Sequence, residues 1–134
     1  MPGKLLLVDD DRFILNALTK LLAAQGYHCS TAVTSDEAWR LIESEPFDLI
    51  LLDVMLPSLS GFQVARQLKF DITTQHIPIV MLTARSDAQS MMAGIERGAD
   101  VYLTKPIDFP ELLRSIETCL RHSAMPARRP PPDE

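Results

Sequence analysis

Short runs of apolar residues separated by helical patterns recur along the chain. Residues 5–8 and 49–52 contain only leucine, isoleucine and valine, which is typical of strands buried on both faces of a parallel sheet. Further strands are predicted at residues 27–32, 77–82 and 101–103. These five strands alternate with five predicted helices. The alternation predicts a doubly wound α/β fold, because right-handed crossovers place helices on both faces of the sheet.

The predicted helices have recognisable ends. Gly26 is a natural stop for the first helix, and Thr34 with Glu37 forms a capping-box pattern at the second. Residues 86–98 are predicted as the fourth helix, and Pro110 fits the first turn of the last one. The apolar face of the first helix is predicted to comprise Phe13, Ile14, Ala17, Leu18, Leu21 and Leu22.

Length and composition indicate one globular domain. The chain has 134 residues, of which 46% are hydrophobic and 23% charged, enough for a single core. Residues 1–122 are predicted to form the domain. Residues 123–134 are rich in proline, lack apolar periodicity and are predicted to be a disordered or polyproline-like tail or linker. Within them, Arg128-Arg129 and three prolines imitate a ligand of proline-binding modules; a solvated linker is the alternative.

The charge of the chain favours protein partners. Its net charge is −5 and its pI about 5.1, which argues against direct binding of nucleic acid by this domain. Cys29 and Cys119 lack CxxC spacing, as expected for reduced thiols in the cytoplasm. Neither a signal peptide nor a membrane-spanning run is recognised, so a cytoplasmic location without membrane attachment is expected.

Polar residues follow the predicted strands at their carboxyl ends. They are Asp9, Asp10 and Asp11 after the first strand, Asp53 after the third, Thr83 after the fourth, and Thr104 and Lys105 after the fifth. In a parallel sheet these positions share one edge, where open α/β folds bind ligands. Asp10 and Asp53 could hold Mg²⁺, and either the cation or Lys105 would relieve the carboxylate repulsion. Alternatively Asp10 or Asp11 only caps the first helix, which leaves Asp53 unexplained.

Several motifs occur in the order of a known family. Taken together they resemble the receiver domain of two-component response regulators, over about residues 4–122. The matching segments are Val8-Asp9-Asp10-Asp11, Leu52-Asp53 with Pro57 and Gly61 beyond it, Met81-Leu82-Thr83-Ala84, and Gly98 through Lys105-Pro106. This resemblance implies a flavodoxin-like, three-layer α/β/α sandwich whose five-stranded parallel sheet has the strand order 2-1-3-4-5.

The resemblance also implies a site. Asp53 looks like the phosphoacceptor, which takes a phosphoryl group from the phosphohistidine of a histidine kinase. Asp10 looks like the direct metal carboxylate and Asp9 like its partner, and the backbone carbonyl of Met55 looks like a further ligand. Asp11 is then left as the expected cap of the first helix. The expected metal is Mg²⁺, with Mn²⁺ as an alternative.

Further positions match the family's phosphate-binding and switch residues. Thr83 and the backbone N–H of Ala84 would bind the acyl phosphate, and Lys105 would pair with another of its oxygens. Tyr102 would turn inward when the threonine moves. Pro106 would follow a cis peptide bond.

Two neighbours of the site depart from the most familiar forms of the family. Met55 is apolar and Arg85 is basic, at positions that resemble those tuning the attack of water on the acyl phosphate. We expect them to set the phosphorylation lifetime.

Three alternative functions fit these residues less well. A haloacid dehalogenase-type phosphatase using Asp53 as its nucleophile needs a second aspartate where this chain has Met55. A nucleotide- or flavin-binding protein would have a glycine-rich loop in place of residues 9–11. A degenerate receiver that signals without phosphate is disfavoured because every expected site residue is present.

The expected function is therefore a phosphorylation-controlled protein-binding module that assists its own phosphorylation and dephosphorylation, not an output enzyme. Its expected partners are a histidine kinase or histidine phosphotransfer protein, and a downstream target or fused output domain. A phosphorylation-dependent homodimer is a further expectation. The switching surface would be formed by the fourth helix, the fifth strand and the fifth helix.

Overall fold

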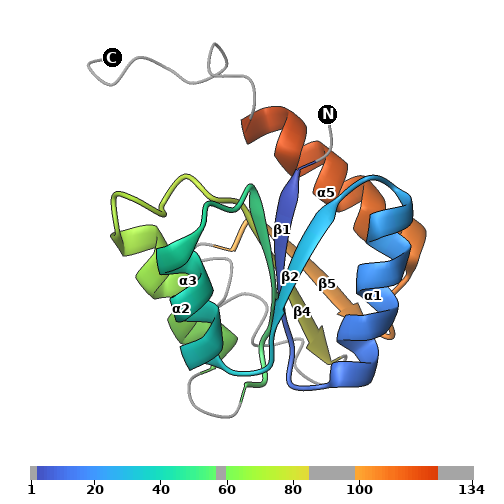
Figure 1. The fold of residues 1–134 in the computed structure, drawn as a ribbon, viewed down its shortest axis with the longest axis horizontal. Helices are drawn as coiled ribbons and strands as arrows, with labels where there is room; N and C mark the ends of the chain where they lie inside the picture. The colour runs from blue at the N-terminus through green and yellow to red at the C-terminus, as the bar shows by residue number, and fades with distance from the viewer. Residues whose placement is uncertain (1–2, 57–59, 85–98, 124–134) are drawn as a thin grey trace.

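The computed structural model describes residues 3–56, 60–84 and 99–123 of the chain. A five-stranded sheet forms the middle layer (Figure 1). Its strands are β1 (Lys4–Val8), β2 (His28–Ala32), β3 (Leu49–Asp53), β4 (Ile79–Ala84) and β5 (Val101–Lys105). All neighbouring strands are parallel, in the order β2-β1-β3-β4-β5. The predicted strand order is confirmed.

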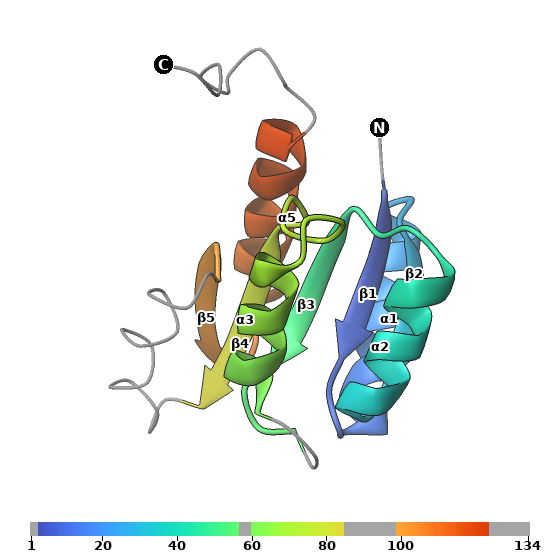
Figure 2. The same cartoon turned by 90° about the vertical axis from the view of Figure 1, so that its left-hand side faces the viewer.

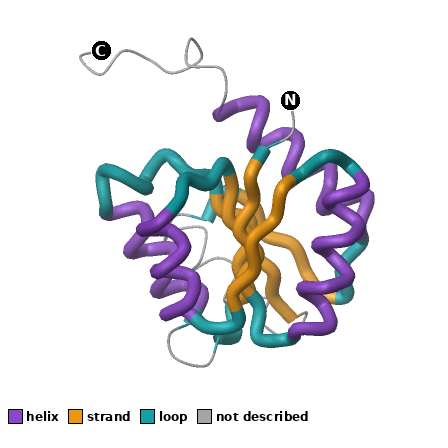
Figure 3. Tube along the Cα trace, in the orientation of Figure 1, coloured by secondary structure: helices purple, strands orange, loops and turns teal. Residues whose placement is uncertain are grey.

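Helices cover both faces of the sheet (Figures 2 and 3). On one face lie α1 (Arg12–Ala24) and α5 (Phe109–Ser123), and on the other α2 (Ser35–Ser44) and α3 (Gly61–Phe70). The helix predicted at residues 86–98 and the tail beyond Ser123 lie outside the described residues. Among the helices that the structure describes, none has the length and apolar character needed to cross a membrane.

Two hydrophobic cores lie on the two sides of the sheet, because successive strand residues point to opposite faces. Leu6 and Ile50 belong to the core under α2 and α3. Their neighbours Leu5, Leu7 and Leu51 belong to the core under α1 and α5. All five are essentially inaccessible to solvent. This double burial explains why the strands read as continuous apolar runs.

The apolar face predicted for the first helix is partly wrong. Leu18 and Leu22 are buried as expected, but the third buried residue is Leu15, and Phe13 is 81% exposed and Leu21 half exposed. Residues 15, 18 and 22 form a narrow stripe at helical spacing that faces the sheet. The hydrophobicity of Phe13 alone could not show on which side of that stripe it lies.

Capping hydrogen bonds fix two helix starts. The Thr34 hydroxyl accepts from the Glu37 N–H at 3.1 Å, as predicted, but the Glu37 carboxylate accepts from the N–H of Val33 at 2.8 Å. In a capping box the Glu37 side chain would accept from the N–H of Thr34, so the predicted box is only half formed. A complete reciprocal box occurs at α3, between Ser60 and Gln63.

Both cysteines are free thiols, Cys29 in β2 and Cys119 in α5. Burial raises the pKa of each to about 11. Neither forms a thiolate at neutral pH, so both behave as packing residues.

Candidate functional site

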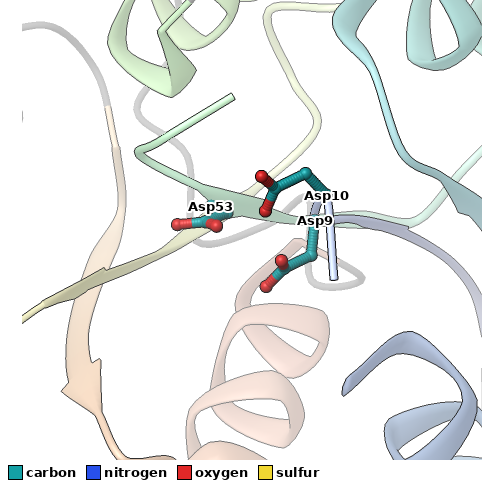
Figure 4. Close-up of side chains that lie close together, drawn as sticks. All are labelled: Asp9, Asp10 and Asp53. Carbon is teal, nitrogen blue, oxygen red and sulfur yellow. The ribbon is translucent and has the colours of Figure 1, made fainter. Parts of the chain in front are cut away.

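Three carboxylates gather where two neighbouring strands end. Asp9 and Asp10 follow β1 and Asp53 ends β3, and one carboxylate oxygen from each lies within 4.8 Å of the others (Figure 4). Asp9 is only 2% exposed and Asp53 only 4%, whereas Asp10 is exposed. The structure therefore brings together the three aspartates that the sequence predicted at this edge.

Asp9 and Asp11 have different local roles. A carboxylate oxygen of Asp9 accepts from the backbone N–H of Asp11 at 2.9 Å, which orients it inside the cluster. The Asp11 carboxylate accepts from the N–H groups of Phe13 at 2.9 Å and Ile14 at 3.3 Å. Asp11 is thus the N-cap of α1, as predicted.

Lys105 joins the cluster from the end of β5. Its Nζ atom lies 3.3 Å from Oδ2 of Asp9 and 3.2 Å from Oδ2 of Asp53. Partial burial lowers the pKa of Lys105, but the two carboxylates outweigh it and hold the pKa above its usual value. A protonated lysine therefore faces the acidic cluster. The peptide bond between Lys105 and Pro106 is cis, as the family resemblance predicted.

Two of the three carboxylates, those of Asp9 and Asp53, are buried close to one another. Burial raises the pKa of Asp9 most strongly; the Asp11 N–H lowers it, Asp53 raises it and Lys105 lowers it, with a net increase. At Asp9, burial and the Asp53 carboxylate together therefore outweigh the Asp11 N–H and Lys105. An oxygen-rich cluster of this kind could bind a metal ion, and its donors suit hard divalent cations.

Asp53 is held at both of its carboxylate oxygens. Oδ1 accepts from the N–H of Met55 at 3.2 Å, and Oδ2 faces Lys105. The Met55 side chain is 66% exposed beside the cluster. The structure thus places Met55 next to Asp53 through its backbone and leaves its side chain accessible from solvent.

Gly61 allows the chain to pass very close to Asp53. A Cβ atom on Gly61 would lie 2.3 Å from the backbone oxygen of Asp53 and 2.8 Å from Cε of Met81. The Gly61 N–H donates to the carbonyl of Val54 at 2.8 Å. Only glycine fits there without displacing β3. Gly61 belongs to the family motif that begins at Leu52-Asp53, but the motif alone did not predict this role.

The remaining predicted residues lie on the adjoining strands. Thr83 is fully buried in β4, one position beyond Leu82, which pairs with Asp53 in the sheet. Ala84 pairs with Lys105 in register. Tyr102 is half-buried in β5, with its ring centroid 6.2 Å from that of Phe62 at an interplanar angle of 40°. Arg85 lies outside the described residues.

The sequence also matches a known family. The family model of the response regulator receiver domain matches residues 5–117. The chain belongs to the response regulator receiver domain family. The receiver domain is a module of two-component signalling rather than a classical enzyme. Because the chain belongs to this family, it is not assigned to the haloacid dehalogenase-type phosphatases.

Individual relatives of the receiver domain agree with the family match. The chain is 42% identical to response regulator MprA of Mycolicibacterium vanbaalenii and 42% identical to the phosphate regulon transcriptional regulatory protein PhoB of Pseudomonas aeruginosa. Each match covers 92% of this chain but only 52% of MprA and 54% of PhoB. The receiver domain thus spans about half the length of these curated relatives.

A solved structure confirms the fold of the receiver domain. The chain is similar to a CheY-like response regulator receiver domain protein from Methanospirillum hungatei, with a TM-score of 0.84 and 28% sequence identity. The similarity covers 92% of this chain and 97% of the other. The flavodoxin-like α/β/α sandwich is therefore established.

Proposed function

We propose that this receiver domain accepts a phosphoryl group on Asp53 and uses it to switch its contacts with other proteins. The observation that carries the proposal is the convergence of Asp53 with two further carboxylates and with Lys105, from three strands, at one edge of the sheet. An acceptor carboxylate, ligands for a cation and a fixed positive charge are the parts that phosphoryl transfer to aspartate requires.

The transfer itself needs little covalent work from the protein. A carboxylate oxygen of Asp53 attacks the phosphorus atom of a phosphohistidine, a P–O bond forms, and the P–N bond to the imidazole breaks. The imidazole nitrogen then takes up a proton. No general base is needed, because the attacking carboxylate carries no proton to remove. Lys105, now 3.2 Å from Asp53, would turn its ammonium group to an oxygen of the incoming phosphoryl group.

Asp9, Asp10, Asp53 and the backbone carbonyl of Met55 would hold Mg²⁺, or Mn²⁺ in its place. The buried Asp9 and the exposed Asp10 offer carboxylate oxygens from one side, and Asp53 offers them from the next strand. When bound, the cation neutralises negative charge on the acceptor and on the phosphoryl oxygens. The raised pKa of Asp9 supports this assignment, because a cation would relieve the cost of ionising it.

Switching requires several contacts at once. Moving a two-state equilibrium from 1:99 to 99:1 takes about 5.5 kcal/mol, whereas a hydrogen bond to a charged group contributes roughly 1.5–3 kcal/mol. We assign these contacts to the Thr83 hydroxyl, the Ala84 N–H and Lys105, together with the cation. Tyr102 would then reorient and change the surface formed by residues 86–98, β5 and α5.

The partners follow from this chemistry. The phosphodonor would be a histidine kinase or a histidine phosphotransfer protein. The relatives named above are about twice as long as the matched region. The target that the phosphorylated domain controls would therefore be a fused output domain or a separate protein. A homodimer formed on phosphorylation is a further candidate.

Mapping the modified residue tests the proposal. The protein is incubated with a small acyl phosphate and Mg²⁺, reduced with borohydride so that an aspartyl phosphate becomes homoserine, and digested for peptide mass analysis. We expect homoserine at position 53. Homoserine at position 9, 10 or 11 instead of 53 would contradict the assignment of Asp53, and so would the absence of homoserine from all four positions.

A further inference from the structure

A second candidate site lies at the opposite edge of the sheet, where the strands begin. It is a cleft of about 430 Å³ between the end of α2 and the segments that lead into β3 and β4. Trp39 and Ile42 of α2 line it together with Phe47 and Ile77. These four residues give the cleft an apolar, aromatic wall.

Acidic side chains also line this cleft. Glu43, Glu45 and Asp71 belong to its lining, together with His76. Glu45 is already paired with Lys4, and Asp71 accepts from the N–H and hydroxyl of Thr73. Within the described part of the chain, the exposed Glu43 pairs with no cation. An acid-lined cleft with an indole wall suits a guanidinium group beside prolines, since arginine and proline both pack on aromatic faces.

The chain itself carries such a segment a few residues after the end of α5. Helix α5 ends at Ser123, at the edge where the strands begin (Figure 1). His122 of α5 and His76 line one neighbouring cleft, and His76 also lines the cleft described above. The tail then reads Ala124 to Ala127, followed by Arg128-Arg129 and three prolines. Five extended residues after Ser123, which bring the chain to Arg128, span about 17 Å.

We propose that the tail segment Arg128–Pro132 docks in this cleft of its own chain. An arginine guanidinium would meet Glu43, and the prolines would pack on Trp39. The attachment makes a weak contact sufficient: a short tether gives an effective concentration in the mM range, so a site with a dissociation constant of about 1 mM would be roughly half occupied. Because the cleft is at the far edge from Asp53, docking would leave the phosphorylation site open and fix where the chain leaves the domain.

Amide NMR spectra of the full chain test this proposal. The wild type is compared with an Arg128→Glu/Arg129→Glu variant. We expect shifts at Trp39, including its indole N–H, and at Glu43 and His76. Glu43→Gln should reproduce part of these shifts, whereas the exposed α5 substitution Glu117→Gln, away from the cleft, should not. Trp39 is the only tryptophan of the chain, so its acrylamide quenching gives a second reading, which should increase in the double variant.

Three results would overturn the proposal. If the double variant shifts only residues near the substitutions, the tail does not occupy the cleft in the isolated chain, and any occupant is another protein. If the shifts at Trp39 vanish on dilution of the wild type, the tail binds a second copy instead. Increased quenching in Arg128→Glu/Arg129→Glu without any shift at Glu43 would also contradict docking at this acid.

Discussion

The Nζ atom of Lys105 lies 3.2 Å from Oδ2 of Asp53, although 52 residues separate the two in the chain. The same ammonium group is 3.3 Å from Asp9. One lysine therefore joins the ends of three strands, β1, β3 and β5. In the proposed function, Lys105 pairs with the Asp53 carboxylate before transfer. It then moves to an oxygen of the phosphoryl group, so it neutralises negative charge both before and after transfer.

Removing this charge should slow phosphorylation. A hydrogen bond to a charged group contributes roughly 1.5–3 kcal/mol, so Lys105→Met should lower the rate of phosphoryl incorporation from a small acyl phosphate by about 10- to 100-fold. Intact mass spectrometry at timed intervals gives the rate. Lys69→Met is the matched control, because Lys69 bonds Asp100 and two backbone carbonyls away from the site. Equal rates for wild type and Lys105→Met would remove Lys105 from the mechanism.

Adding one methyl group at Gly61 should disturb β3. Its Cβ would lie 2.3 Å from the Asp53 backbone oxygen, so Gly61→Ala must move the backbone and should cost about 1–3 kcal/mol of unfolding free energy. Urea denaturation measures this loss. In the control Gly3→Ala the nearest atom is the Asp48 carboxylate at 2.8 Å, the end of a side chain that can move, so only about 0.5 kcal/mol is expected. Similar losses for both variants would contradict the tight approach.

The ionised Asp9 carboxylate should lower the free energy of unfolding when no metal is bound. Its pKa is raised on folding, so its contribution to stability is fully present below pH 3.8 and is lost as the pH rises through the folded value. At pH 7 without Mg²⁺, Asp9→Asn should therefore raise the unfolding free energy by roughly 0.5–2 kcal/mol. Asparagine can still accept from the Asp11 N–H.

Saturating Mg²⁺ should reverse this order, because a cation that binds only the folded state stabilises the wild type. Thermal melts at both metal concentrations give the comparison. If Asp9→Asn is less stable than the wild type without metal, ionisation of Asp9 does not destabilise the folded state.

Met55 and Arg85 should set how long the phosphoryl group remains. The Met55 side chain is exposed next to Asp53, where a polar replacement could orient water. We expect Met55→Asn and Arg85→Ala to change the first-order loss of phosphate from phosphorylated Asp53 by about 10-fold, roughly 1.4 kcal/mol in the barrier. Decay of the phosphorylated mass after removal of the donor measures it. Unchanged decay in both variants would exclude this role.

The sequence predicted the strands and the acidic edge well because both depend on local patterns. A parallel strand buried on both faces has a distinctive apolar run, and its carboxyl end must lie at the shared edge; Asp9, Asp10 and Asp53 follow from this alone. Position alone left Asp10 and Asp11 as candidates for the cap of α1, and the assignment of Asp9 and Asp10 to the metal then left Asp11.

Features that depend on how helices and loops pack against the sheet could not be predicted from the sequence. Phe13 fits a helical pattern, yet only the placement of α1 on the sheet decides that it is exposed. The tight contact of Gly61 with β3 depends on the path of a loop, and the Glu37 bond to Val33 on the entry angle of α2. Lys105 was predicted at the acidic edge, but its pairing with Asp9 and Asp53 in particular required the fold.

Intact mass spectrometry of the wild type and of Asp53→Asn tests the central claim most directly. Both proteins are incubated with a small acyl phosphate, once with Mg²⁺ and once with EDTA. We predict the gain of one phosphoryl group by the wild type with Mg²⁺, little gain in EDTA, and none by Asp53→Asn. A wild type that gains no phosphoryl group, or an Asp53→Asn protein that gains it equally, would contradict the account.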